Sequence, residues 1–165
     1  MKTSLQRVLL LLLLLVPVTV VDAAQQADSG PVAVKIESYI VSEVTGEDGN
    51  KQEKFTQATT ARPGQVVEYR VSATNTGETT LPAGTVEIIG PVPQGTHYLE
   101  GSATPSSEQR LTEFSADGGQ SWSEPPVLVN GEVAKPESYT AVRWTLLSDL
   151  EPGKSATFVY RVVVE

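Results

Sequence analysis

The sequence predicts an all-β fold, an antiparallel β-sandwich with immunoglobulin-like Greek-key connections. Apolar and polar residues alternate with a period of two in several short segments, as in strands with one buried face. Gly, Pro, Asn and Asp separate these segments at short intervals, which is typical of sandwiches and barrels. No helical periodicity occurs beyond the N-terminal segment, and at this length we favour a two-sheet sandwich over a barrel.

The first 23 residues have the pattern of a secretory signal peptide. Lys2 and Arg7 form a positively charged N-terminal region. The apolar run 8–21 that follows has 14 residues, fewer than the roughly 20 that a membrane-spanning helix needs. We expect cleavage after Ala23, with cleavage after Ala24 as the alternative. An uncleaved anchor is the competing interpretation, which the length of the run disfavours.

Residues 24–30 are small and polar and predict a flexible leader, whereas residues 31–165 predict a single β-sandwich domain. Removal of residues 1–23 leaves ten basic and nineteen acidic side chains, a net charge of −9. This acidity disfavours binding to nucleic acid or to anionic membrane surfaces. We expect an exported protein, periplasmic, surface-associated or extracellular, with no membrane insertion after signal cleavage. Because the chain has no cysteine, packing alone must stabilise its fold.

The first strand is expected to begin near Pro31. Its apolar residues alternate up to Ile36, and the phase changes at Ser38 and Tyr39, which predicts a bulge or a strand that changes sheet. The region 101–140 is interpreted either as one ordered insertion or as several loops. We predict turns at residues 45–51 and 62–64, and further strands at residues 86–89, 96–99, 111–115, 127–129, 141–147 and 156–164.

The clearest strand spans residues 65–75. Its strict alternation indicates one buried face and one solvated face, as in an antiparallel sheet. Glu68 belongs to the face that we expect to meet solvent, and Trp144, on a later strand, is expected to lie between the two sheets. The residues of the expected buried face are Val67, Tyr69, Val71 and Ala73.

Several segments together carry a resemblance to a known family. They are residues 61–71, the tripeptide 75–77, residues 91–96 and 101–103, residues 114–122, and residues 142–144 and 150–156. In their order and spacing they resemble the bacterial conserved-repeat domain, domain of unknown function number eleven, which occurs in exported and cell-surface proteins. The resemblance covers residues 31–165 and implies an immunoglobulin-like β-sandwich without attributed catalysis. It supplies no functional residues.

The sharpest local motif is a turn that resembles the Asp-box hairpin of exported β proteins. It comprises Ser115, Asp117, Gly119, Ser121 and Trp122. The carboxylate can accept hydrogen bonds from backbone amides of the turn, Gly119 permits a positive φ, and the indole can pack beneath the loop. We therefore interpret the motif as structural. Binding of sugar or calcium at its tip is the functional alternative.

Other candidate sites are interpreted as solvated or structural. The loop 47–50, which contains Asp48, offers oxygen ligands for calcium, but the twelve-residue pattern with a terminal Glu is absent. Asp149 and Glu151 flank a turn and are interpreted in the same way. His97 is the only histidine, and we expect it to be exposed on a strand. We expect no catalytic residues, no cofactor and no metal site.

These observations favour a structural or protein-interaction role at the cell envelope, with a protein partner bound by a sheet face, loops or an open edge strand. The alternative is a carbohydrate-binding module, in which an aligned row of exposed aromatic side chains would hold a glycan. An enzyme is the least favoured class, because no nucleophile pattern accompanies the single histidine. The candidate aromatic residues are Tyr39, Tyr98, Trp122 and Tyr139.

Overall fold

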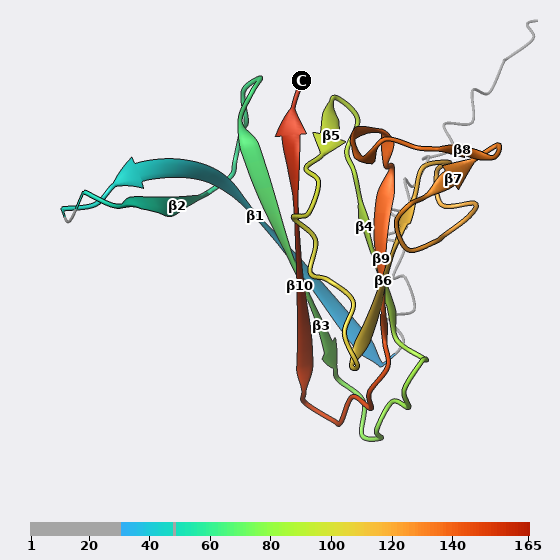
Figure 1. The fold of residues 1–165 in the computed structure, drawn as a ribbon. Helices are drawn as coiled ribbons and strands as arrows, with labels where there is room; N and C mark the ends of the chain where they lie inside the picture. Colours follow the sequence, from blue (N-terminus) through green and yellow to red (C-terminus); the bar gives the residue numbers. More distant parts are fainter. Residues whose placement is uncertain (1–30, 48) are drawn as a thin grey trace, which may run out of the picture.

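Two antiparallel β-sheets face each other in the computed structural model, which describes residues 31–47 and 49–165 (Figure 1). The prediction of an all-β antiparallel sandwich is confirmed. The first sheet has five strands in the order β2-β1-β3-β10-β5, and the second has three in the order β4-β9-β6. The elements are β1 (Val32–Thr45), β2 (Lys51–Gln57), β3 (Val66–Asn75), β4 (Glu87–Pro91), β5 (Thr96–Tyr98), β6 (Arg110–Ser115), β7 (Leu128–Val129), β8 (Glu132–Val133), the 3-10 turn η1 (Pro136–Ser138), β9 (Ala141–Leu146) and β10 (Ser155–Val164).

The predicted signal peptide and leader, residues 1–30, lie outside the described residues. Within the described residues, no helix is both long enough and apolar enough to cross a membrane. The chain crosses between the sheets repeatedly, from β3 to β4, from β4 to β5, from β5 to β6 and from β9 to β10. The segment between β6 and β9 contains the two-stranded ribbon β7-β8 and η1.

The core lies between the two sheets and is built around stacked aromatic rings. Trp144 on β9 is fully buried, as predicted. Its ring centroid lies 5.1 Å from that of Phe158 on β10, and its Nε1–H donates to the carbonyl oxygen of Thr104 at 3.1 Å. Buried aromatic rings remove a large apolar area from water, and the indole N–H also has a partner. Thr104 lies in the segment between β5 and β6, and its own amide donates to the Val159 carbonyl oxygen of β10 at 2.8 Å, so this segment links β9 to the first sheet.

β1 is one continuous strand within one sheet, so both alternatives predicted at Ser38 and Tyr39, a bulge and a change of sheet, are wrong. Its pairing with β3 runs without a gap from Val32 to Val41. From Tyr39 onward the strand also pairs with β2 on its other side. The change of phase in the sequence therefore marks the point where β1 gains a second neighbour. Beyond that point the β1–β2 hairpin extends away from the body of the sandwich (Figure 1).

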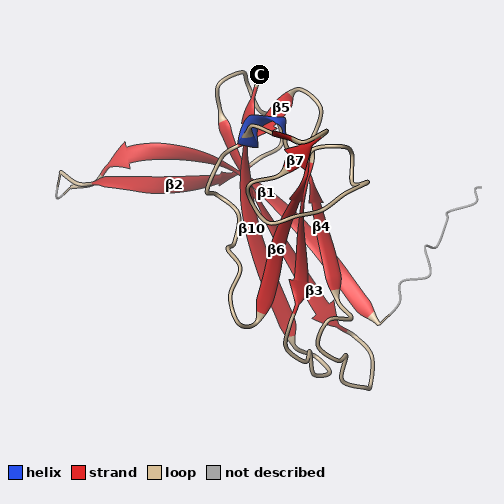
Figure 2. Cartoon of the chain, turned by 45° about the vertical axis from the view of Figure 1, so that its right-hand side comes forward, coloured by secondary structure: helices blue, strands red, loops and turns tan. Residues whose placement is uncertain are grey.

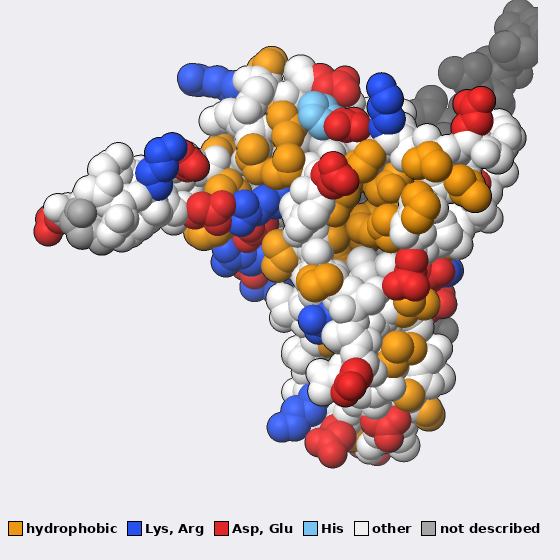
Figure 3. Space-filling view, viewed as in Figure 1, with side chains coloured by type: hydrophobic (Ala, Val, Ile, Leu, Met, Phe, Trp, Pro, Cys, Tyr) orange, Lys and Arg blue, Asp and Glu red, His pale blue; other side chains and the backbone are white. Residues whose placement is uncertain are grey.

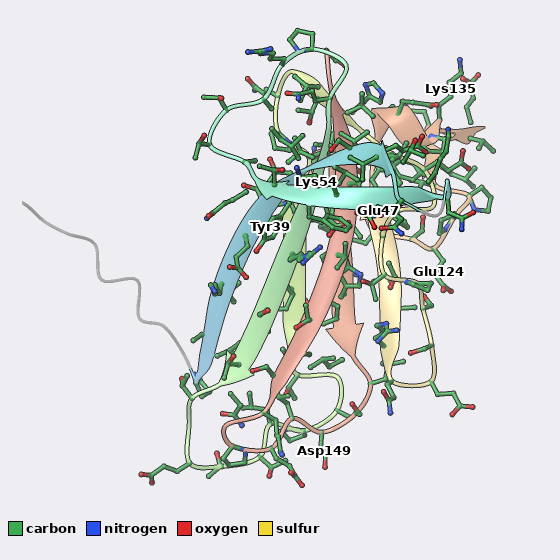
Figure 4. The ribbon with its side chains drawn as sticks, turned by 90° about the vertical axis from the view of Figure 1, so that its left-hand side faces the viewer. Tyr39, Glu47, Lys54, Glu124, Lys135 and Asp149 are labelled. Atoms are coloured by element: carbon green, nitrogen blue, oxygen red, sulfur yellow. The ribbon has the colours of Figure 1, made fainter. Side chains whose placement is uncertain are left out.

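Glu68 is buried, although its alternation pattern predicts a solvated position. It is only 3% exposed, because two arginine side chains cover its carboxylate. Arg70 donates to Oε1 at 2.7 Å and Arg161 donates to Oε2 at 2.8 Å. The two terminal nitrogens of Arg161 also hold Glu53 of β2, at 2.6 and 2.7 Å. This ion-pair network links the hairpin to the outer face of the sheet. Figure 4 views the molecule with the hairpin in front of that sheet.

Candidate interaction surface

The two sheets differ in width, so the wider sheet is covered only in part. Phe114 of β6 lies against Tyr98 of β5, with ring centroids 5.1 Å apart, and Trp144 of β9 stacks on Phe158 of β10. By the order of strands, β4 then lies over β3. The second sheet, as far as the structure describes it, ends before β1 and β2. In Figure 2, β4 and the first half of β1 lie beside each other at one side of the sandwich.

The uncovered half of β1 presents apolar side chains on the inner face of its sheet. Val34 pairs with Ala73 and Ile36 pairs with Val71, both of which are fully buried core residues of β3. Directly opposed residues of an antiparallel pair share a face. Val34 and Ile36 therefore face the same side as the core, yet they are 52% and 53% exposed. The strip that they form continues the core surface past the edge of the second sheet.

The same half of β1 also has a free backbone edge. The Ala58 N–H donates to the carbonyl oxygen of Ser38, so the even-numbered residues of β1 point toward the side of β2. Pairing with β2 begins only at Tyr39. The N–H and C=O groups of Val34 and Ile36 therefore point outward from the sheet, where the described chain provides no neighbouring strand.

β4 has a second free edge next to this strip. The Leu146 N–H of β9 donates to the carbonyl oxygen of Val86, so residues 86, 88 and 90 bond to β9. The backbone groups of Glu87 and Ile89 consequently point away from β9, and the Ile89 side chain is 50% exposed on the outer face. We call the surface formed by Val34, Ile36, Glu87 and Ile89 the open side.

The charges around the open side are mainly acidic. Lys35 is already paired with its neighbour Glu37, with Nζ 3.0 Å from Oε1. Glu87 is exposed, and among residues 31–47 and 49–165 it takes part in no ion pair. The open side therefore offers an apolar strip, unpaired strand edges and one carboxylate without a cationic neighbour.

Asp117 occupies the centre of the tight turn that follows β6. Its carboxylate accepts hydrogen bonds from Ser121 Oγ at 2.5 Å and Ser115 Oγ at 2.7 Å. The amides of Gln120 and Ser121 donate to it as well, each at 3.0 Å. The bonds from Ser121, followed by that from Ser115, lower the pKa of Asp117 to about 2. Since donors from the turn engage both oxygens, the carboxylate serves the turn itself.

The remaining members of this turn close it against the outer face of the second sheet. Gly119 has a φ of 87°, which glycine adopts at little cost. The Trp122 Nε1–H donates to the Gly119 carbonyl oxygen at 3.1 Å, and the guanidinium of Arg143 lies 4.8 Å from the centre of the indole ring. Arg143 in turn donates to Glu113, at 2.6 Å for the shorter bond. The motif is thus a loop that contacts β9 through Arg143, which in turn is bound to β6 through Glu113.

The other residues singled out in the sequence do not come together as a site. His97 is partly exposed on β5 and lies 3.7 Å from Glu165, whereas Asp149 accepts the Ala83 amide at 2.9 Å at the end of the sandwich remote from the hairpin (Figure 4). Asp48, in the loop considered for calcium, lies outside the described residues. Elsewhere, in the described part of the chain, no three His, Cys, Asp or Glu side chains are grouped closely enough to hold a metal ion.

The four aromatic residues considered for glycan binding do not form a common exposed platform. Tyr98 and Tyr139 are buried in the core, with ring centroids 5.8 Å apart. Tyr39 is half-buried beneath Arg70 at the base of the hairpin, and Trp122 belongs to the turn after β6. Alternation in a strand does not distinguish these positions, because their exposure depends on which element covers them.

Comparison with known proteins finds no match to this chain among protein-family models, curated proteins or solved structures. The resemblance to the bacterial conserved-repeat domain therefore stays a prediction.

Proposed function

We propose that the protein is an exported, non-catalytic, immunoglobulin-like module that binds a protein partner at the open side. The observation that carries the proposal is the exposure of Val34 and Ile36 on the inner face of β1, next to two strand edges that no other strand of the described residues pairs with. Proteins usually protect such edges with charges, prolines or bulges, because an open edge pairs readily with another chain. Addition of a partner strand to a sheet edge is a common mode of recognition.

The chemistry of the open side defines the partner as an extended segment with alternating side chains. A strand added beside β4 would bond to the backbone groups of Glu87 and Ile89 and lie above β1. Its inward side chains should be apolar, because they would meet Val34 and Ile36. One outward side chain should be basic, since it would stand beside Glu87. The net charge of −9 expected for the mature chain also favours a cationic partner by steering its approach.

Export, a location at the cell envelope and membership in the bacterial conserved-repeat family belong to the same proposal. They rest on the N-terminal pattern of residues 1–23 and on the segments that resemble the family. The carboxylates of Asp117 and Glu68 form hydrogen bonds that hold the fold together. This structural use of both carboxylates agrees with a role in binding.

Position-specific photo-crosslinking in cells that export the full chain tests the proposal. A photoreactive amino acid replaces Val34 or Ile36 on the open side, or Thr157 on the outer face of β10 as the matched control. We expect one discrete protein adduct from positions 34 and 36 and none from position 157. Ile89→Pro, which removes an outward N–H from the edge of β4, should abolish the adduct.

Adducts of equal yield from all three positions, or none from positions 34 and 36, would contradict a protein partner at the open side. A glycan array with the same purified chain addresses the alternative. Saturable binding of a glycan that the Ile89→Pro change leaves intact would favour the carbohydrate-binding module instead.

A further inference from the structure

A cavity of about 320 Å³ opens at the side of the molecule opposite the open side. It lies between β5, β6 and the loop that precedes β9, and β5 and β6 are the edge strands most distant from β2 and β4 in their sheets. Pockets for small ligands in proteins begin at about 300 Å³. The cavity is thus large enough for a small molecule and independent of the proposed partner surface.

The floor of the cavity is aromatic. Tyr98, Phe114 and Tyr139 line it, and their ring centroids lie 5.0 to 5.8 Å from one another. Ala103 and Pro136 contribute further apolar walls. Figure 3 shows hydrophobic side chains gathered on this face of the molecule, with acidic side chains at their border. An occupant must therefore have an apolar body.

Three neutral polar side chains of the lining form hydrogen bonds within the protein. The Tyr98 hydroxyl accepts the Ala103 amide at 3.1 Å. Ser106 Oγ accepts the Thr112 amide at 2.9 Å, and Thr112 Oγ1 donates to the carbonyl oxygen of Thr104 at 2.9 Å. These bonds help to fix the walls of the cavity, while the Tyr98 hydroxyl, which accepts in its bond, keeps its own O–H as a donor.

The charged side chains that line the cavity, Glu100 and Glu124, are both acidic. Ser106 Oγ donates to Glu124 Oε1 at 3.0 Å and so holds that carboxylate at the rim, next to β6 in Figure 4. Burial, and in addition the negative charge of Glu100, raise the pKa of Tyr98 and of Tyr139. Glu100 thus lines the same cavity as the aromatic rings. Carboxylates accept hydrogen bonds but do not donate them, so a ligand bound at the rim should carry hydrogen-bond donors.

We propose that this cavity binds a small organic cation, with its ammonium group between Glu100 and Glu124 and its apolar body on the aromatic floor. An anion would be repelled by both carboxylates. A neutral sugar could hydrogen-bond to the carboxylates but would gain no charge attraction from them, whereas an ammonium group would. A cation with an aromatic or branched aliphatic body matches both the charge and the surface of the cavity.

The test is an NMR titration of the purified, exported chain with three probes of similar size: phenethylamine, 2-phenylethanol and 3-phenylpropionate. We expect saturable shifts of resonances from Tyr98, Phe114 and Tyr139 with phenethylamine. Binding should be at least roughly tenfold weaker with the neutral alcohol and absent with the anion. Glu100→Gln and Glu124→Gln should each weaken the amine roughly two- to fivefold, the range expected for an exposed ion pair.

Glu132→Gln is the matched control, because Glu132 is exposed on β8 and does not line the cavity. It should leave the affinity unchanged. Equal binding of the amine and the alcohol, no binding of the amine, or equal losses in all three variants would overturn the proposal. Photo-crosslinking at the open side does not depend on this result. Each experiment therefore tests its own proposal, and one proposal can fail without the other.

Discussion

Single residues that bond to several partners hold neighbouring strands together on the outer faces of this sandwich. Glu68 is the clearest case, because it is buried on a face that alternation alone would assign to solvent. Its carboxylate bonds to Arg70 on its own strand and to Arg161, which lies 93 residues later in the chain. A sequence pattern cannot reveal a partner so distant. The burial of Glu68 therefore follows from the pairing of β3 with β10.

Replacing Glu68 should destabilise the fold because both arginines would lose a buried acceptor. We expect Glu68→Gln to lower the free energy of unfolding by about 2 kcal/mol, below the range for a fully buried pair, since both arginines keep some solvent access. Chemical denaturation measures the change. Glu43→Gln, at an exposed ion pair of the hairpin, is the control and should have no measurable effect. Equal stabilities of both variants would contradict the structural role of Glu68.

Asp117 predicts a dependence of stability on pH. Hydrogen bonds from Ser121 and Ser115 lower its pKa in the folded state to about 2, from an ordinary value of 3.8. A lowered folded-state pKa means that the stabilisation is present above about pH 4 and is lost as the pH falls through about 2. We expect the difference in unfolding free energy between the unmodified protein and Asp117→Asn to shrink over this window. Denaturation series at pH 6 and pH 2 measure it, and a constant difference would exclude the ionised carboxylate as its source.

At the scale of secondary-structure elements, contact between the sheets requires a residue without a side chain in β4. A Cβ atom at Gly90 would lie 2.6 Å from Cε1 of Tyr160 and 3.2 Å from the ring of Trp144. Tyr160 cannot move easily, because its hydroxyl donates to the Pro91 carbonyl oxygen at 2.7 Å. Close packing of β4 on the core aromatic rings is therefore built into the sequence at this position.

Gly90→Ala should consequently destabilise the protein through overpacking, by about 1 to 3 kcal/mol. Thermal or chemical denaturation detects the loss. The neighbouring change Ile89→Ala is the matched control, because this side chain is half exposed on the outer face and its loss should cost less than about 0.5 kcal/mol. If alanine at position 90 were tolerated as well as alanine at position 89, β4 would not pack as the structure has it.

Other elements show where prediction from sequence ends. The alternation in residues 65–75 predicts β3 and its buried face correctly, because one face meets a core and the other does not. β2 is missed, since Lys51–Gln57 is exposed throughout and has no apolar face. Its residues become a strand because β1 continues past Tyr39 and offers an edge for a hairpin. Pairing determines β2, whereas the hydrophobic pattern determines β3.

At the scale of the whole molecule, the open side arises from a difference between two sheets. In sequence, Val34 and Ile36 alternate in the same way as the buried residues of β3, so their exposure could not be predicted. It depends on the number of strands in the facing sheet, which is three against five. The acidic aromatic cavity could likewise not be predicted from the sequence, because its lining residues come from several separate segments between Tyr98 and Tyr139.

Hydrogen exchange of individual amides, followed by NMR in the full exported chain, tests the open side most directly. The free edges predict fast exchange at Val34, Ile36 and Ile89 and slow exchange at the adjacent amides of Lys35 and Ile88, which point into their sheets. Addition of the crosslinked partner, once isolated, should slow the exposed amides and leave the others unchanged. Slow exchange at Val34, Ile36 and Ile89 in the free protein would mean that these edges are already paired, and would contradict the account of the open side.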